Sequence, residues 1–404
     1  MSLISTAYRD IENRFAPRTR PRQGLAFIEK NLIPALKGAL IMSRFVLCLL
    51  VVLCIGSEVR AAGITTHMFM SEKAIENVDD PRLRSFLEER RDAVLGGSCS
   101  PDWGGGLREL PFQKAPGQSM YEAHTPEYIE AFLTHIMEKC GPPYTGECGK
   151  LAAMFLGTAA HNMEDDVYDE IFLREVRRRD IETGSLDTSL DLILLVDHDR
   201  WLVSPKYYVP AEDVSAVYRQ VGVEIKPWQV RAGARMHKAG LVGERLIALP
   251  VRNKEVKITP WAAENIYSYP GGVEYCGQVV ARYWKGLWDI LHGRQDTLPA
   301  VIRMHPEDGG KIATDGYVTA VFPRSIIKAL LNEHTFRIED ESGNTVPTRV
   351  RCMQKESDYT RVCSMLPEAP LQPGKSYTYH ISSEIRFYSQ KNLPHPVKGT
   401  FYVK

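Results

Sequence analysis

The period of the hydrophobic residues changes near Gly293, and this change constrains the fold more than any other feature of the sequence. From Thr66 to about Leu291, apolar residues recur at intervals of three and four residues, which is typical of amphipathic helices. From Ile302 to Lys404, short alternating stretches are separated by turn signals such as SGN and QPGK, which is typical of strands. The sequence therefore predicts a mainly α-helical domain followed by a small all-β domain.

Individual elements follow from the same two patterns. The glycine-rich stretch GGSCSPDWGGG, residues 96–106, predicts a loop between helices. The number and spacing of the strands in the last hundred or so residues suit a β-sandwich. The predicted helices cover 71–78, 126–139, 149–179, 185–203 and 276–291, and the predicted strands lie within 317–323, 335–353, 359–366, 376–385 and 398–404.

A short apolar segment near the start has the features of a signal peptide, although it does not begin at Met1. The segment starts at Met42, and its apolar run at 45–55 is too short for a comfortable membrane span. We interpret 1–41 as a mis-annotated extension and 42–61 as the signal peptide. The alternative is a cytoplasmic tail before a signal anchor. The first interpretation predicts an exported protein, either periplasmic or extracellular.

Export would make the cysteines candidates for disulfides. Six cysteines follow the predicted signal peptide, and an even number in an oxidising compartment favours pairing. Cys140 and Cys148 border a turn-rich loop, and Cys352 and Cys363 flank a predicted hairpin. These two pairs would leave Cys99 to pair with Cys276. The alternative is that the thiols are free and buried.

The stretch FLGTAAHNMEDDVYDEIF, residues 155–172, places a histidine and two acids on one face of a predicted helix. His161, Asp165 and Asp169 are four residues apart, and like charges at this spacing repel each other. Either this face is solvated or cations lie along it. The rise of a helix separates His161 from Asp169 by roughly 12 Å, so such a column is long enough for more than one ion.

Further candidate ligands occur along the predicted helical domain. Histidine and carboxylate together suit zinc, whereas calcium and magnesium favour sets made only of oxygen. Each candidate alone is weak, because a single histidine beside an apolar run is usually structural and paired acids often form a solvated face. Their order along the chain is the stronger signal. The candidates are His67, Asp102, His124, Asp187 and Asp191.

That order resembles the zinc-dependent phospholipase C and S1/P1 nuclease superfamily. The resemblance is strongest to the branch that holds the catalytic domain of glycosylphosphatidylinositol-specific phospholipase D. It extends from Ala62 to about Leu195 and rests on the stretches GITTH, SPDW, EAHTPEYIEAFLTHI, FLGTAAHNMEDDVYDE and DTSLD. The later stretches FRIEDESGNTVP and LQPGKSYTYHI resemble bacterial Ig-like domains. We therefore expect a catalytic domain at 62–295, a linker at 296–312 and an Ig-like β-sandwich at 313–404, to which we assign no chemistry.

The resemblance implies a cluster of two to three zinc ions. One ion would be held by His67 and by the α-amino group of Ala62, which cleavage after Ala61 would create. Asp165 would bridge ions from the middle of its helix. A second ion would be held by Asp102, His124 and His161, and a third by Asp169, Asp187 and Asp191. Asp169 departs from the family, which usually has histidine there, and Asp187 departs from its nuclease branch, so calcium or manganese could occupy the third site.

The expected activity is hydrolysis of phospholipid headgroup phosphoesters by a metal-activated water. Asp102 would orient or deprotonate that water, and Trp103 and Phe112 would contact substrate during a transient contact with a membrane surface. A nuclease or nucleotidase, and a non-catalytic metal-stabilised surface-binding protein, are the alternatives. The net charge is zero, and no basic stripe with interleaved aromatic residues is present, so we expect no stable nucleic-acid partner.

Overall fold

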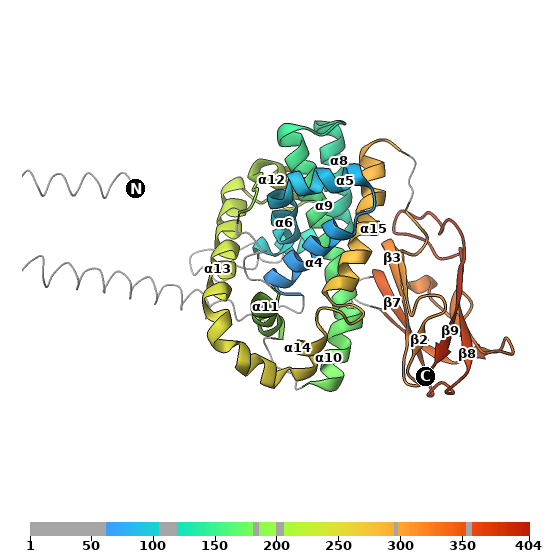
Figure 1. Cartoon of the computed structure of the whole chain (residues 1–404). Coiled ribbons are helices and arrows are strands. Elements are labelled where there is room, and N and C mark those ends of the chain that lie inside the picture. Colours follow the sequence, from blue (N-terminus) through green and yellow to red (C-terminus); the bar gives the residue numbers. More distant parts are fainter. Residues whose placement is uncertain (1–61, 105–118, 181–185, 199–205, 295–297, 353–357) are drawn as a thin grey trace, which may run out of the picture. The chain divides into compact units, whose positions relative to one another are not determined.

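The computed structural model describes residues 62–104, 119–180, 186–198, 206–294, 298–352 and 358–404. The predicted extension, the predicted signal peptide and Phe112 therefore lie outside the described residues. Figure 1 shows a helical region followed along the chain by strands, which confirms the predicted change of structure after Leu291. No helix in the described ranges is both long enough and apolar enough to span a bilayer.

The helical region contains eleven α-helices within the described ranges, and most of the predicted helices are confirmed with small changes at their ends. The α-helices are α4 (Ile64–Asn77), α5 (Pro81–Glu89), α6 (Arg91–Ser98), α8 (Pro126–Lys139), α9 (Gly146–Val167), α10 (Arg174–Arg179), α11 (Leu186–Asp197), α12 (Ala211–Gln220), α13 (Pro227–Ile258), α14 (Pro260–Asn265) and α15 (Val273–Leu291). Shorter helical turns are η2 (Ser100–Gly104), η3 (Ser119–His124), η4 (Tyr168–Leu173) and η5 (Lys328–Leu330), of which η4 is a π-helix.

The helix α9 forms the centre of this region. Nearly all of its residues from Leu151 to Val167 are buried, and a helix that is buried on all sides must be covered by other elements. The helices α4, α6, α8 and α15 pack against it. The π-helical turn η4 continues α9 directly into α10, and π-helical turns of this kind are frequent at functional sites. The column of His161, Asp165 and Asp169 thus begins in the core.

Glycine brings α6 unusually close to α9. A Cβ atom at Gly97 would lie 2.1 Å from the carbonyl oxygen of Met154, and one at Gly157 would lie 2.1 Å from that of Val94. Only residues without a Cβ atom allow these backbones to approach so closely. The stretch at 96–106, which we predicted as a loop, therefore begins as the end of α6, because its glycines serve packing between helices.

The C-terminal region consists of two sheets (Figure 1). One has the strand order β1-β3-β7-β6 and the other the order β2-β9-β8-β4-β5. A single hydrophobic cluster contains residues of both sheets, including Phe322, Phe336 and Phe401. The strands are β1 (Arg303–His305), β2 (Lys311–Ile312), β3 (Val318–Ile327), β4 (Phe336–Glu339), β5 (Thr345–Val346), β6 (Thr348–Cys352), β7 (Tyr359–Pro367), β8 (Ser376–Ile381) and β9 (Val397–Val403). The β region thus begins at Arg303, inside the segment that we assigned to a linker.

Two of the three predicted disulfides are present. Cys140 is bonded to Cys148, and Cys352 is bonded to Cys363 across the β6–β7 pair. The prediction for Cys99 and Cys276 is wrong, since both thiols are free and buried. The Sγ atom of Cys276 donates to the carbonyl oxygen of Gly271, 3.2 Å away. That thiol is therefore satisfied locally inside the helical core.

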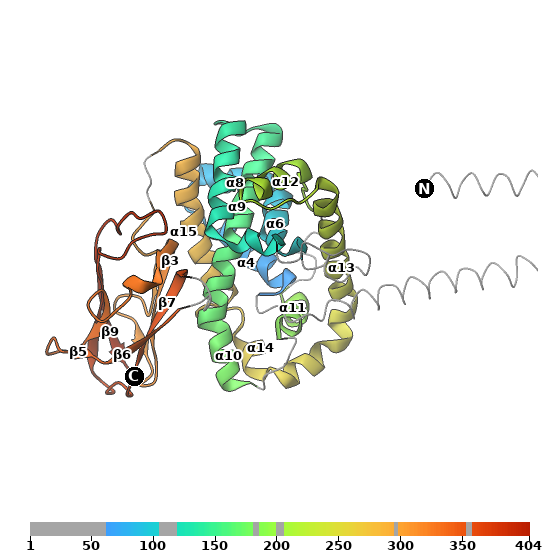
Figure 2. The ribbon, with the colours of Figure 1, turned by 180° about the vertical axis from the view of Figure 1, so that it is seen from behind.

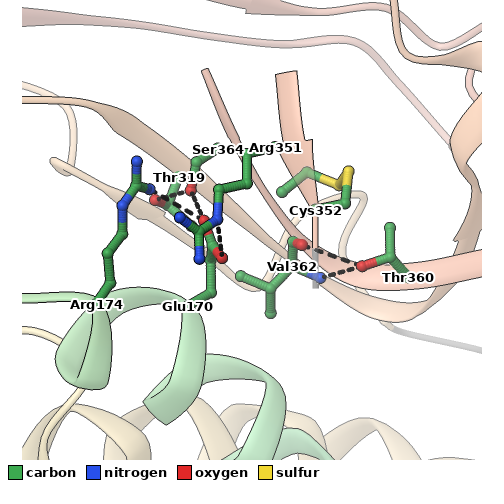
Figure 3. The surroundings of a disulfide bond; sticks show 9 residues. Glu170, Arg174, Thr319, Arg351, Cys352, Thr360, Val362 and Ser364 are labelled. Carbon is green, nitrogen blue, oxygen red and sulfur yellow. Dashed lines mark hydrogen bonds and ion pairs between the residues drawn. A yellow bond between two sulfur atoms is a disulfide. The ribbon is translucent and has the colours of Figure 1, made fainter. Parts of the chain in front are cut away.

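The strand β7 contacts α9 and η4 beside the column of candidate ligands. The Nε atom of Arg361 lies 2.9 Å from Oδ2 of Asp166, and its Nη2 atom donates to the carbonyl oxygen of Asn162 at 2.8 Å. Glu170 accepts a hydrogen bond from Ser364 at 2.9 Å and pairs with Arg174 and Arg351 (Figure 3). The β region therefore supplies basic and polar partners to buried acids of the central helix.

Candidate metal centre

His161 lies on α9 with its side chain fully buried and its orientation fixed. Its Nδ1 atom donates to the carbonyl oxygen of Ser98 at 2.7 Å, a contact that the close α6–α9 crossing makes possible. Because Nδ1 carries the proton in this bond, Nε2 keeps its lone pair in the neutral ring. Nε2 lies 3.2 Å from Oδ2 of Asp165, one turn further along the helix. A backbone acceptor behind the ring is typical of histidines that bind metals.

His67 approaches the same carboxylate from α4. Its Nδ1 atom lies 2.8 Å from Oε2 of Glu164, and its Nε2 atom lies 3.1 Å from Oδ1 of Asp165. The His67 ring stacks on that of His161, with centroids 3.9 Å apart. Glu164 also accepts from the hydroxyl group of Ser71 at 2.9 Å. Glu164 thus holds the His67 ring so that Nε2 points toward Asp165.

His124 and Asp102 complete the cluster from η3 and η2. The Nε2 atom of His124 lies 3.1 Å from Nε2 of His161 and 3.5 Å from Oδ1 of Asp102. Asp102, His124 and Asp165 are partly exposed, whereas His67 and His161 are buried. The donor atoms lie within 4.8 Å of one another in two groups, His67 with Asp102 and His161, and His124 with His161 and Asp165. Five predicted ligands thus converge, and three of them are partly exposed.

The ionisation of these groups reflects their proximity. Burial would raise the pKa of Asp165, but the charges of His161 and His67 outweigh burial and hold this pKa well below its usual range. Burial likewise opposes the charged form of Asp102, yet His161 and His124 lower its pKa to about 2. Burial disfavours a protonated His67, but Asp165 and Glu164 raise its pKa well above its usual value. Protons that the imidazoles hold here compete with a cation for the same nitrogen atoms.

The predicted first residue of the mature chain lies at this centre. The backbone nitrogen of Ala62 is 3.2 Å from Oδ1 of Asp165. Cleavage before Ala62 would therefore create an amine beside Asp165, in the position where the prediction requires one.

The three acids assigned to a third ion are arranged differently. The carboxylate of Asp191 accepts hydrogen bonds from the amides of Thr65 and Thr66, at 3.0 and 2.8 Å, at the start of α4. Asp169 is buried, and its Oδ1 atom has no hydrogen-bond partner among the described residues. Burial, reinforced by the charges of Asp165 and Asp187, raises the pKa of Asp169 well above its usual value. Neither of the two compact donor groups within the described ranges includes Asp169, Asp187 or Asp191.

Trp103 does not occupy the position that we expected. Its side chain is fully buried, and its backbone carbonyl packs against Gly233 of α13. It follows Asp102 directly and helps to fix η2 in the core. A tryptophan in a glycine-rich stretch predicts a surface contact, but the ring is buried and stacks on that of Tyr207, with centroids 6.2 Å apart.

One buried histidine outside the predicted set is electrostatically linked to the centre. His237 of α13 is 8% exposed, and its Nδ1 atom lies 3.2 Å from the hydroxyl oxygen of Tyr207. Its Nε2 atom has no hydrogen-bond partner among the described residues. Burial lowers the pKa of His237 to about 4, and Asp102, His161 and His67 also act on it. Nothing in the flanking sequence marks this histidine, because it is a single residue on a helix rich in basic residues.

Comparisons with known proteins give one distant relative. No family model matches the chain. The chain is 24% identical over 193 residues to the phosphatidylinositol-glycan-specific phospholipase D of Dictyostelium discoideum, which covers 43% of this chain and 19% of that protein. The chain therefore spans about a fifth of its relative's length. This similarity supports a distant relation to a phospholipase.

The solved structures similar to this chain do not establish its fold, because their TM-scores are low. CopC from Methylosinus trichosporium OB3b has a TM-score of 0.20 at 16% identity, over 26% of this chain and 91% of that one. The N-terminal part of the bacterial S-layer protein SbsC has a TM-score of 0.22 at 12% identity, over 78% of this chain and 79% of that one.

Proposed function

We propose that the mature protein is an exported, metal-dependent phosphodiesterase that hydrolyses phosphoester bonds in phospholipid headgroups. The observation that carries this proposal is the convergence of donor atoms from His67, Asp102, His124, His161 and Asp165 within two groups less than 5 Å across. The similarity to a phospholipase D supports the choice of substrate class. The two disulfides fit an oxidising compartment, and the predicted signal peptide at 42–61 would direct the chain there.

The donor set fits divalent zinc. Three imidazoles and two carboxylates are ligands that zinc prefers, and an oxygen acceptor holds the Nδ1 atom of each buried imidazole. His67 and the Ala62 amine would hold one ion, with Asp102, His124 and His161 at a second and Asp165 between them. Asp169, whose buried oxygen lacks a hydrogen bond, is the candidate ligand for a third ion together with Asp187 and Asp191.

Zinc bound here would polarise a phosphoryl oxygen and lower the pKa of a bound water to near 7. Asp102 is partly exposed and its lowered pKa keeps it ionised, so it can accept a hydrogen bond from that water and orient it. His237, whose buried Nε2 atom has no hydrogen-bond partner among the described residues, is a further candidate to contact the substrate. The described chain needs no serine or cysteine nucleophile for this reaction.

We also propose that the two-sheet region is an Ig-like domain, which is supported by the hydrophobic core that both sheets share. Its role at the centre is indirect, because Arg361 and Ser364 bind Asp166 and Glu170, which are neighbours of the candidate ligands in the sequence.

Three measurements on the purified mature protein test the proposed function. We expect elemental analysis to find two to three equivalents of zinc and N-terminal sequencing to begin at Ala62. We expect turnover of phosphatidylcholine or phosphatidylinositol and none of single-stranded DNA. His161→Gln should lose both metal and turnover, whereas His135→Gln, which changes a histidine paired with Asp213 on another helix, should retain both.

Each of these measurements can contradict the proposal. Turnover of DNA without turnover of lipid would favour a nuclease on the same scaffold. A stoichiometric metal content without any phosphodiesterase activity would favour a non-catalytic, metal-stabilised protein. An active chain that retains residues 1–61 would exclude the Ala62 amine as a ligand.

A further inference from the structure

The helix α13 separates two different surfaces. Its inward side borders the elements that carry the candidate ligands, since Glu244 accepts from the hydroxyl group of Thr65 on α4 at 2.8 Å and Gly233 packs against Trp103 of η2. Its outward side carries residues that recur at intervals of three, four and eight, so they lie on one helical face. Figures 1 and 2 show α13, coloured yellow, at the edge of the helical region. We call the outward residues the docking face: Arg235, Lys238, Val242, Leu246, Leu249 and Lys257.

The centre of the docking face is apolar and exposed. Val242, Leu246 and Leu249 are 40%, 65% and 63% exposed. Six large hydrophobic side chains in the described part of the chain are exposed. Four of them lie on α13, namely the three of the docking face and Trp228. Single exposed hydrophobic residues are common, but a concentration on one helix indicates an interaction surface.

The apolar centre is flanked by positive charge. Arg235 and Lys238 precede it and Lys257 follows it, and none of the three forms an ion pair with a described residue. Both acidic residues of α13 are engaged elsewhere, since Glu244 accepts from Thr65 and Glu255 accepts from Ser189. The docking face therefore has a net positive charge and no acidic side chain.

We propose that the docking face binds the surface of a membrane that contains acidic phospholipids. The aliphatic side chains would enter the boundary between headgroups and acyl chains, and the basic side chains would contact the headgroups, as in other interfacial helices. The choice of a lipid surface rests on the proposed function, because a phospholipid substrate is located in such a surface. A second copy of the chain fits less well, since pairing two docking faces would bring like charges together.

Vesicle binding tests this inference without any need for turnover. The mature protein is sedimented with phosphatidylcholine vesicles that either contain or lack phosphatidylglycerol, in a chelator so that lipid is not hydrolysed. Each basic residue near an acidic surface strengthens binding by about fivefold, so three predict a preference on the order of 100-fold that salt removes. Leu246→Glu with Leu249→Glu should weaken binding at least about tenfold without changing the melting temperature. Met137→Glu, which changes an exposed residue of α8, is the matched control and should bind like the wild type.

The outcomes separate the docking face from the proposed function. Equal binding to both vesicle types, or wild-type binding by the double variant, overturns the docking face. A dimer that the double variant abolishes, with no binding to vesicles, overturns it in favour of a second copy. Hydrolysis of the soluble diester bis(p-nitrophenyl) phosphate by the metal-loaded wild type is measured in parallel. Selective vesicle binding without such hydrolysis supports the docking face and refutes the proposed function.

Discussion

Substitution of Gly157 by alanine should separate α6 from α9 and disturb the metal centre from a distance. The added Cβ would lie 2.1 Å from the carbonyl oxygen of Val94 and 2.8 Å from the amide nitrogen of Ser98, and neither backbone atom can rotate away. An ordinary contact requires about 3.4 Å, so the helices must part by about 1.3 Å. The bond from His161 to the carbonyl oxygen of Ser98, now 2.7 Å, would then lengthen to about 4 Å and break.

The expected cost follows from these changes. Overpacking of a close crossing destabilises by about 1–3 kcal/mol. Loss of the His161 bond and of the hydrogen bond between Ser100 and Thr158, at 2.8 Å across the same crossing, adds about 1 kcal/mol each. The higher helix propensity of alanine returns up to about 1 kcal/mol. The variant should therefore lose about 2–4 kcal/mol in the free energy of unfolding, and its zinc affinity should fall because the His161 ring is no longer held.

Chemical unfolding and zinc titration of the mature protein measure both effects. Gly141→Ala is the matched control, because a Cβ atom at Gly141 meets no other atom within 4 Å. If Gly157→Ala unfolds at the same denaturant concentration as Gly141→Ala and binds zinc as tightly, then the glycine crossing does not position His161 and the reasoning fails.

Three further predictions concern the metal, the β region and pH. A chelator should lower the melting temperature of the wild type, and zinc should restore it, because the ions bind only the folded centre; His161→Gln should show neither response. Arg361→Met should destabilise by about 3–5 kcal/mol, because it leaves the buried carboxylate of Asp166 without this ion pair, and Asp166→Asn in the same chain should recover most of the loss in urea unfolding. His237 has its pKa lowered to about 4 by burial, so the unfolded chain binds a proton from about pH 6.5 downward and the folded chain only near pH 4. The wild type should therefore lose up to about 3 kcal/mol more stability than His237→Phe as pH falls from 6.5 to 4, and equal acid sensitivity of the two in unfolding curves would contradict this assignment.

Local signals at helix ends account for the prediction of α8, whereas α5 and α13, which also begin with proline, were not among the predicted helices. The helix α8 has the predicted bounds, because Thr125 caps its start, Pro126 occupies its first turn and Cys140 ends it. The last three residues of α6, 96–98, were predicted as part of a loop, because the glycines there serve contact with α9 rather than chain reversal. Two strands, β1 and β2, were missed because they are three and two residues long and too short to show alternation.

The candidate site was predicted in part for similar reasons. Five candidate ligands were predicted because they combine histidine and carboxylate in an order that resembles a known family, and the structure brings their side chains together. The positions of Trp103 and His237 depend on how η2 and α13 pack, which no local pattern reveals. The role of Asp191 as acceptor for the first amides of α4 likewise depends on a contact between residues far apart in the chain.

Side chains from the β region contact the helical region across the boundary near Gly293. They are those of Arg361, Arg351 and Ser364. A fragment that ends there would keep every candidate ligand, yet Asp166 and Glu170 would lose the partners that β6 and β7 provide. Asp166 would lose its ion pair with Arg361 and Glu170 would lose that with Arg351 while keeping Arg174, so the turns that carry Asp165 and Asp169 would be less stable. Truncation where the helices end and the strands begin is therefore not expected to yield a functional helical domain.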